Sequence, residues 1–433
     1  MDGHAAEVAA RPMTAAEQVR PGVDAGRLLT HLTRLAAIGA TPEGGVTRLA
    51  FSPEDVAGRA YVAGLMREAG LAVRVDAAGN LIGARPGTAP GTGTLVLGSH
   101  LDTVVNGGAL DGAYGVLAAV EVARTLAGHD LAHDLAVVAF CDEEGGHGTM
   151  GMLGAHGFAG ALPPGIAKTQ DERGVPIRDL LAAVGGDAAR LAGAAWPPGE
   201  IAAYLELHIE QGDVLERRGV PIGVVDSIAG RVNVAVTVEG AAGHAGTTPM
   251  DHRADALAAA ARVVLAVRAI AAEERVVLRA TTGTCAVEPG MWNVIPGRVR
   301  LGVEFRDVTA GRLDGALARL SAVAAEIAAA CGVSIAVEPG ARTTPVDCDP
   351  RLRDLVAEAA GARGLDWHRL PSGAGHDAQI VARVAPIGMI FVPSRGGISH
   401  APGEHTAPHH LVWGADVLLG AVLRFDGGGI ARR

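Results

Sequence analysis

Three histidines and a set of acids in this 433-residue sequence could together bind metal. His100 and Asp102 follow one apolar run, Asp111 opens a glycine-rich turn, and His208 and His400 lie near the ends of later runs. An imidazole can bind a metal while a nearby carboxylate fixes its tautomer. Each residue alone also has an ordinary explanation, such as a turn histidine or a helix N-cap, so the interpretation depends on the whole set.

Glu143 and Glu144 are adjacent acids directly after another apolar run. Two like charges at this spacing repel each other unless a cation or a proton lowers the cost. One carboxylate could bind a metal while its neighbour accepts a proton from an activated water; the alternative is a solvated acidic loop. Together these side chains suffice for two divalent ions that share one carboxylate. Imidazole and carboxylate donors without thiolate favour Zn²⁺, Mn²⁺, Co²⁺ or Ni²⁺.

The elements around these residues predict an α/β domain. Residues 95–97 and 135–140 are continuously apolar, as in buried strands, and residues 115–126 form an amphipathic helix after the first of them. Residues 204–210 alternate, which places His208 on a polar face. Because ligands gather at the carboxyl ends of strands in open α/β sheets, we expect the polar side chains to meet there.

A second unit is predicted inside the first. Its elements are a strand, a helix, two strands, a helix and a strand, at 232–238, 253–273, 275–287, 298–306, 310–330 and 333–337. This βαββαβ order is that of a ferredoxin-like unit. A helix at 350–364 and a buried strand at 385–392 then return the chain to the first domain. The sequence thus predicts an N-terminal extension at 1–22 and a catalytic domain divided between 23–225 and 340–433. The inserted lid spans 226–339.

The composition narrows the class of protein. The sequence is 49% hydrophobic with 61 glycines, as expected for an α/β protein with many tight turns. Its formal charge of −10 includes no long basic run, which argues against nucleic acid or an anionic membrane as a partner and favours a small metabolite. The four cysteines form no CxxC pair and no apolar segment resembles a secretory signal, so a cytoplasmic location is expected.

Eight motifs carry a resemblance to a known family. They are GSHLDTV (98–104), DGAYGVLAAVE (111–121), DEEG (142–145), HIEQG (208–212), GHAGTTPM (243–250), NVIPG (293–297), PSGAGHDAQ (371–379) and GGISHAP (396–402). Over residues 25–430 the chain resembles the amidase and carbamoylase branch of the dinuclear zinc-peptidase-like (M20) hydrolases. The resemblance implies a mixed sheet flanked by helices, with an inserted ferredoxin-like domain that serves as lid and dimer interface.

The resemblance also implies roles for individual residues. His100, Asp111 and His208 would bind one metal, and Asp111, Glu144 and His400 the other. Glu143 would be the general base, Asp102 the partner of His100, and His244 an oxyanion-stabilising residue that reaches the partner subunit's site in a homodimer. Residues implied to contact the substrate, some through its carboxylate or through backbone, are Asn293, Arg306, Gly373, Gly375, Gln211, Arg231 and His376.

The implied reaction is hydrolysis of the carbamoyl C–N bond of N-carbamoyl-L-amino acids, giving an amino acid, ammonia and carbon dioxide. Allantoate or ureidoglycolate amidohydrolase and β-ureidopropionase are alternatives, as is a metal-containing binding protein without catalysis. The sequence departs from the family pattern after the double glutamate, where residues 145–150 read GGHGTM. This segment is expected to line the pocket, with His147 as a loop residue.

Overall fold

The computed structural model describes residues 21–427. The predicted N-terminal extension, residues 1–22, lies outside that range except for its last two residues. Among the described residues, none of the helices combines the length and apolar character needed to cross a membrane.

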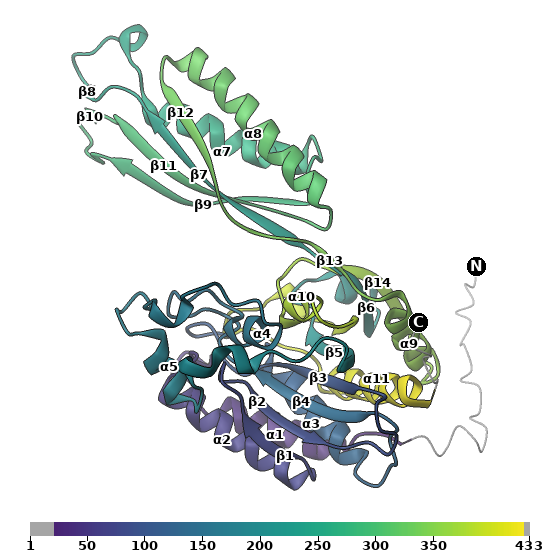
Figure 1. Ribbon diagram of the computed structural model, residues 1–433. Coiled ribbons are helices and arrows are strands. Elements are labelled where there is room, and N and C mark those ends of the chain that lie inside the picture. The colour runs from purple at the N-terminus through teal and green to yellow at the C-terminus, as the bar shows by residue number, and fades with distance from the viewer. Residues whose placement is uncertain (1–20, 428–433) are drawn as a thin grey trace, which may run out of the picture.

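A large mixed sheet forms the body that contains both chain ends of the described range (Figure 1). Within residues 21–427 it has nine strands, ordered β1-β2-β4-β3-β5-β15-β6-β13, with β14 also paired to β6. The central strands β4, β3, β5 and β15 are parallel. The strands are β1 (Ala72–Val75), β2 (Leu81–Arg85), β3 (Thr94–His100), β4 (Asp134–Phe140), β5 (Ile201–Ile209), β6 (Ile222–Ile228), β13 (Val346–Asp347), β14 (Trp367–Ser372) and β15 (Ile387–Val392).

Helices cover both faces of this sheet. One apolar core contains side chains from α1 (Ala25–Ala36), α2 (Pro53–Glu68), α3 (Ala113–Thr125), α9 (Pro350–Gly361) and α11 (Pro408–Gly427). The opposite core contains side chains from α4 (Leu153–Phe158), α6 (Val214–Arg218) and α10 (Asp377–Val381). Shorter segments are α5 (Ile177–Ala183), η1 (Ile166–Lys168), η2 (Ala188–Ala194) and η4 (Arg395–Gly397).

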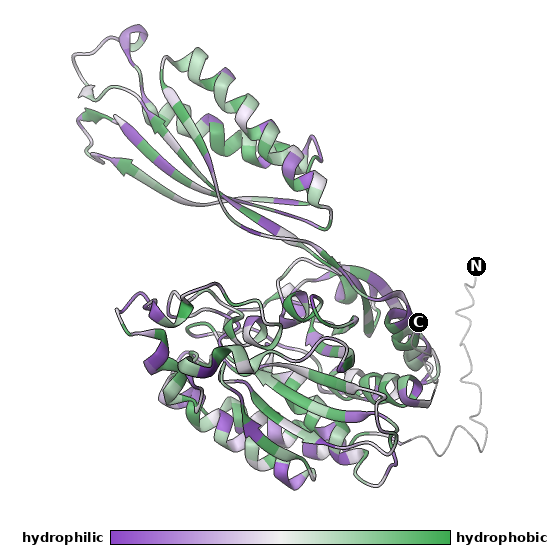
Figure 2. Ribbon diagram, viewed as in Figure 1, coloured by the Kyte–Doolittle hydropathy of each residue, from purple (hydrophilic) through white to green (hydrophobic). Residues whose placement is uncertain are grey.

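The two cores explain the continuous apolar runs. Side chains alternate along a strand, so Leu95 and Leu97 of β3 enter one core while Val96 enters the other. Figure 2 shows β3 and β4 as predominantly apolar along their length. The predicted strands at 95–97 and 135–140 and the helix at 115–126 are therefore confirmed, as β3, β4 and α3.

A four-stranded antiparallel sheet stands apart from the body and is joined to it through β7 and β12 (Figure 1). Its order is β12-β7-β11-β9, and two helices cover one face. The valines of β7 at 232, 234, 236 and 238 are buried against those helices. The elements follow in the order β7 (Gly230–Glu239), α7 (Ala256–Ala272), β9 (Arg279–Glu288), β11 (Arg298–Asp307), α8 (Ala310–Cys331) and β12 (Ser334–Thr343). At the far tip lie β8 (Gly243–His244), η3 (Met250–His252) and β10 (Val294–Ile295).

One predicted strand is longer than expected. The strand predicted at 333–337 continues as β12 to Thr343, because a register shift between Pro339 and Arg342 keeps it paired with β7 past the proline.

The alternating run at 204–210 forms part of β5. Its polar residues Glu206 and His208 share one face of the strand, and both are buried beneath a layer that includes α10.

Candidate metal centre

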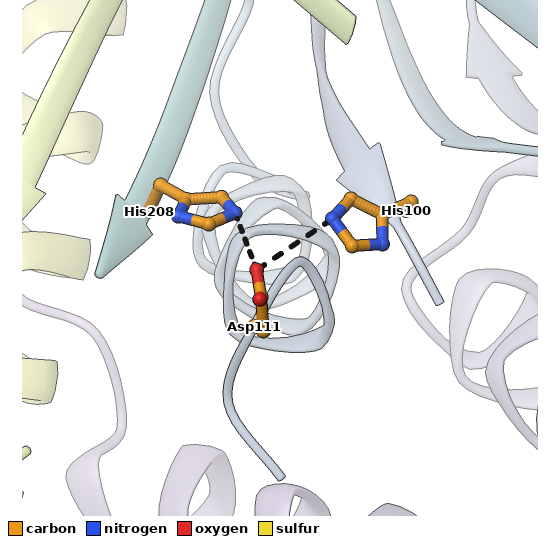
Figure 3. Close-up of side chains that lie close together, drawn as sticks. All are labelled: His100, Asp111 and His208. Carbon is orange, nitrogen blue, oxygen red and sulfur yellow. Dashed lines mark ion pairs between the residues drawn. The ribbon is translucent and has the colours of Figure 1, made fainter. Parts of the chain in front are cut away.

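The carboxyl ends of two neighbouring parallel strands bring the first candidate ligands together. His100 is the last residue of β3, and His208 lies one residue before the end of β5. Asp111 stands in the turn that leads into α3, and its carboxylate points between the two imidazoles (Figure 3). Asp111 Oδ1 lies 3.1 Å from His208 Nε2 and 3.8 Å from His100 Nε2. The three ligand atoms all lie within 4.8 Å of one another.

A second group shares the same carboxylate. Asp111 Oδ2 lies 3.0 Å from His400 Nε2, which lies 3.4 Å from Glu144 Oε1. These ligand atoms also lie within 4.8 Å of one another. Residues 21–427 contain four groups of candidate ligands; two of them are joined through Asp111 and have the same members as the two ligand sets that the resemblance implies.

The hydrogen bonds of the imidazoles suit metal binding. His100 Nδ1 lies 3.0 Å from the carbonyl oxygen of Asp102, and His208 Nδ1 lies 2.8 Å from that of Ile209. A carbonyl only accepts, so each Nδ1 donates and each Nε2 is the nitrogen available to a cation. Both Nε2 atoms face Asp111. The donor set of imidazole and carboxylate therefore fits a divalent ion of the zinc or manganese kind.

Asp102 acts differently from the expectation for a His-x-Asp pair. Its carboxylate lies 3.9 Å from His100 Nδ1, and its backbone carbonyl makes the closer contact. The carboxylate instead accepts hydrogen bonds from the backbone N–H groups of Glu143 and Glu144, at 3.3 and 3.0 Å. The single carboxylate of Asp102 thus positions the backbone of both glutamates beside the site.

The acids of the site carry an unbalanced negative charge. Burial raises the pKa of Glu143 well above its usual range, and the Asp377 and Glu144 carboxylates raise it further. Burial likewise raises the pKa of Glu144 to about 7. Both oxygens of Asp377 are buried without a hydrogen-bond partner. Bound cations would offset this repulsion.

The two histidines nearest Asp111 have raised pKa values, which favours their charged forms. Burial lowers the pKa of His208, but the Asp111 carboxylate more than compensates and the result is a pKa of about 9. The hydrogen bond to Asp111 also raises the pKa of His400 to about 9. Burial favours protonated Asp111, yet His208 and His400 hold its pKa well below the usual range. Protonated His208 and His400 would therefore offset the negative charge of the Asp111 carboxylate.

A cavity of about 310 Å³ opens over this centre. Its lining includes all five predicted ligands and the predicted base Glu143; the ligands are His100, Asp111, Glu144, His208 and His400. Of the residues predicted to contact substrate, the cavity lining includes Gln211, Arg231, Arg306, Gly375 and His376. His147 is not part of the lining.

The arginines come from the four-stranded sheet. Arg231 and Arg306 are directly opposite each other in the β7–β11 register, although like charges at such positions are unfavourable. Arg306 Nη1 donates to the Gly373 carbonyl at 3.0 Å and its Nε donates to Glu304 at 2.6 Å. Two guanidinium groups at one edge of the cavity provide an anion-binding edge.

Gln211 and His376 have protein partners of their own. Gln211 Nε2 donates to Asp111 Oδ2 at 2.9 Å, so this amide contacts the bridging carboxylate. His376 is buried, with its ring 4.6 Å from that of His208 and its Nε2 2.8 Å from Ser372 Oγ. Burial lowers the pKa of His376 well below its usual range, so it is neutral.

The structure does not bring His244 or Asn293 to the cavity of the same chain. Both lie at the tip of the four-stranded unit, where Val294 of β10 pairs with His244 of β8. The Asn293 carbonyl accepts from the Ala245 N–H at 3.0 Å. His244 is exposed.

Sequence reasoning missed Glu404. Its Oε1 accepts from the N–H groups of Leu110 and Asp111, at 2.8 and 3.1 Å, and Ser399 donates to its Oε2 at 2.8 Å. The carboxylate thus ties the Asp111 turn to the loop that carries His400. No local sequence signal marks such a contact across nearly three hundred residues. Met152, His156 and Ile380, which line the cavity, were also missed, whereas the expectation that residues 145–150 line it is met by Gly145, Thr149 and Met150.

Comparisons with known proteins identify the family of this chain. The model of Peptidase family M20/M25/M40 matches residues 96–424. The N-carbamoyl-L-amino acid amidohydrolase of Geobacillus stearothermophilus is 42% identical over 92% of this chain and 97% of its own. The allantoate amidohydrolase of Bacillus subtilis is 38% identical over 90% and 94%.

A solved structure agrees in fold as well as in sequence. The hydantoinase/carbamoylase family amidase of Burkholderia multivorans superposes with a TM-score of 0.87 at 39% identity, covering 94% of this chain and 98% of that one. The matched segment contains every residue of the two ligand groups. The chain belongs to the M20/M25/M40 peptidase family.

Proposed function

We propose that this protein hydrolyses the carbamoyl C–N bond of N-carbamoyl-L-amino acids. The observation that carries the proposal is the cavity itself, which has two ligand groups joined through Asp111 on one side and paired arginines on another. That arrangement suits a small substrate with a hydrolysable carbonyl near one end and a carboxylate at the other. Relatives with this activity in their names, from Geobacillus stearothermophilus and Paenarthrobacter aurescens, support the same substrate class.

Two divalent ions, Zn²⁺ or Mn²⁺, Co²⁺ or Ni²⁺, would be held by His100, Asp111 and His208 and by Asp111, Glu144 and His400. When bound, they would supply Lewis-acid chemistry, polarising the substrate carbonyl and making water acidic enough to lose a proton near neutral pH.

Glu143 is the proposed general base and acid. Its Oε2 lies 3.9 Å from His100 Nε2, beside the ligand groups and facing the cavity. It would accept a proton from the attacking water and return that proton to the leaving nitrogen. Once it has accepted that proton, its carboxyl group can act as the acid toward the leaving nitrogen.

The paired arginines would hold the substrate's carboxylate. Arg306 offers a planar fork suited to two hydrogen bonds, and Arg231 adds a second positive charge. Gly373 positions Arg306 through its carbonyl. Gln211, Gly375 and His376 are the further proposed contacts in the same chain. Asn293, which lies beside His244 at the tip, would contact the substrate in the partner subunit's site.

The four-stranded unit is proposed to be a ferredoxin-like lid and dimerisation domain spanning 226–339, with the catalytic domain at 23–225 and 340–433. His244 would stabilise the oxyanion in the partner subunit's site. Around it, Met250 and Met291 are 77% and 58% exposed, and Trp292 is fully exposed. Apolar side chains gathered on one tip favour contact with a second copy.

A second candidate is allantoate hydrolysis, favoured by the Bacillus subtilis relative of that name. Both reactions cleave a ureido C–N bond next to a carboxylate-bearing carbon and use the same proposed machinery.

Ammonia release from the metal-loaded protein tests the proposal. N-carbamoyl-L-amino acids should release ammonia, and Glu143→Gln should lower the turnover number by about 10²- to 10⁴-fold while metal content stays the same. A Glu143→Gln variant with the parent's rate would show that another residue is the base. Failure of every ureido compound would refute the proposed function.

A further inference from the structure

The cavity has a third wall besides the ligand groups and the arginines. Three parts of the chain form it: the segment after the double glutamate, helix α4 and helix α10. The side chains that line it are Thr149, Met150, Met152, His156, Gln379 and Ile380. None of these cavity-lining side chains is an acid, a lysine or an arginine. Burial also lowers the pKa of His156, which keeps its imidazole neutral.

Apolar groups dominate this wall. Met150, Met152 and Ile380 contribute thioether and methyl groups, and the Gln379 amide already donates to the Ala229 and Thr344 carbonyls at 3.1 and 2.9 Å. Methionine is flexible and polarisable, so such a wall adapts to apolar groups of different shape.

The local backbone places Met152 at the cavity. Met152 has a φ of +48°, in the left-handed region, and Gly151 before it has a φ of +68°. The Met152 methyl group lies close to Gly375, where an added Cβ would approach it to 2.8 Å. Gly375 therefore leaves room for the end of this side chain, which can shift as the cavity is filled.

A substrate of the proposed class also has three groups around its α-carbon. If the ureido group lies at the ligand groups and the carboxylate at Arg231 and Arg306, the side chain is left facing the third wall. We propose that Met150, Met152 and Ile380 form the side-chain pocket of this enzyme and select N-carbamoyl amino acids with flexible apolar side chains. This inference rests on the proposed function.

The same wall disfavours other substrates. An acidic side chain would find no ion-pair partner on this wall, which contains no lysine or arginine. The second ureido arm of allantoate would face thioethers and methyl groups, with Thr149 and His156 as its nearest polar partners, and unpaired N–H groups are costly. β-Ureidopropionate has no side chain to fill the pocket.

Steady-state kinetics on a substrate panel test the inference. The panel is N-carbamoyl-L-methionine, N-carbamoylglycine, N-carbamoyl-L-aspartate, allantoate and β-ureidopropionate. The methionine compound should exceed the glycine compound in kcat/KM by about tenfold or more, because each added methylene in an apolar pocket contributes to discrimination. Allantoate as the best substrate would overturn the inference and leave hydrolysis of ureido bonds standing.

Met152→Ala and Met150→Ala test the wall directly. Each should lower kcat/KM for the methionine compound by about tenfold and change that for the glycine compound by less than about twofold, which also shows that the variant is folded. Val56→Ala, at a 41% exposed position on α2 outside the cavity lining, serves as the control and should change neither.

Equal loss on both substrates would show that the side chain lies elsewhere. If the metal-loaded parent hydrolysed no member of the panel, the proposed function would fail and the side-chain pocket with it. The two failures are therefore distinguishable.

Discussion

Asp111 joins the two ligand groups at the centre. Its two oxygens face three imidazoles, its backbone N–H donates to Glu404, and Gln211 donates to its carboxylate. A bridging ligand must hold both oxygens in place at once, so the groups that orient it should matter almost as much as the ligands themselves.

Glu404→Gln should weaken metal binding. Glutamine keeps one acceptor oxygen and replaces the other with an NH₂ group. That NH₂ group would face either the Leu110 and Asp111 N–H groups or the Ser399 hydroxyl, so one of these hydrogen bonds to the side chain would be lost. Loss of such an orienting group typically lowers metal affinity by about 10- to 100-fold, measurable by competition with a chromogenic chelator. Glu68→Gln, at an exposed side chain on α2, is the control. Unchanged affinity in Glu404→Gln would show that the Asp111 turn holds its place without this contact.

Metal affinity should rise between pH 6 and pH 9. In the protein without a cation, His208 and His400 have pKa values of about 9 and so carry protons on the ligating nitrogens at lower pH. A metal must displace those protons, which makes binding weaker as pH falls. Calorimetry in buffers of different ionisation enthalpy should show net proton release at pH 7. Binding without proton release would contradict the assignment of these two histidines.

Among the helices and strands, the sequence predicted the strands that lie between the two apolar cores. Strands β3, β4 and β15 were predictable because residues such as Val96 and Leu97 must be apolar on both faces. Edge strands such as β1 were not, since its exposed side chains carry no apolar pattern. The site residues were predictable because they have metal-binding chemistry at strand ends. Glu404 and Met152 were not, because their positions depend on contacts between distant segments.

The turn between β3 and α3 tolerates no side chain at position 112. Gly112 has a φ of +62°, and a Cβ there would overlap the His100 ring. Gly112→Ala should therefore displace His100 and abolish binding of one metal, as measured by metal content after dialysis. Gly64→Ala on α2 has open space and should stabilise the fold by about 0.5–1 kcal/mol. Full metal content in Gly112→Ala would refute this account of the turn.

At the scale of the whole molecule, the two units meet at a narrow crossing. Gly230, the first residue of β7, lies against Pro345, and the Arg306 side chain reaches Gly373 from the four-stranded unit. A unit joined through two short linkers is suited to hinge closure over the cavity. His244 lies at the far tip of this unit, away from the cavity of its own chain. The site in which it would act is therefore that of the partner subunit.

Subunit mixing tests that assignment. His244→Ala and Glu143→Gln chains should each be nearly inactive alone. In a mixed dimer, one site combines an intact Glu143 with an intact partner His244, so activity should return to a fraction of the parent's. Absence of recovery after verified subunit exchange would contradict a cross-subunit role for His244.

Five side chains between positions 100 and 400 are proposed to hold a pair of cations that the reaction requires. They are His100, Asp111, Glu144, His208 and His400. Elemental analysis of purified protein, combined with ammonia release before and after chelation, measures this directly. The account predicts about two divalent ions per chain, loss of activity on their removal and recovery on adding Zn²⁺ or Mn²⁺. A metal-free protein that hydrolyses ureido substrates and is indifferent to chelator would contradict it.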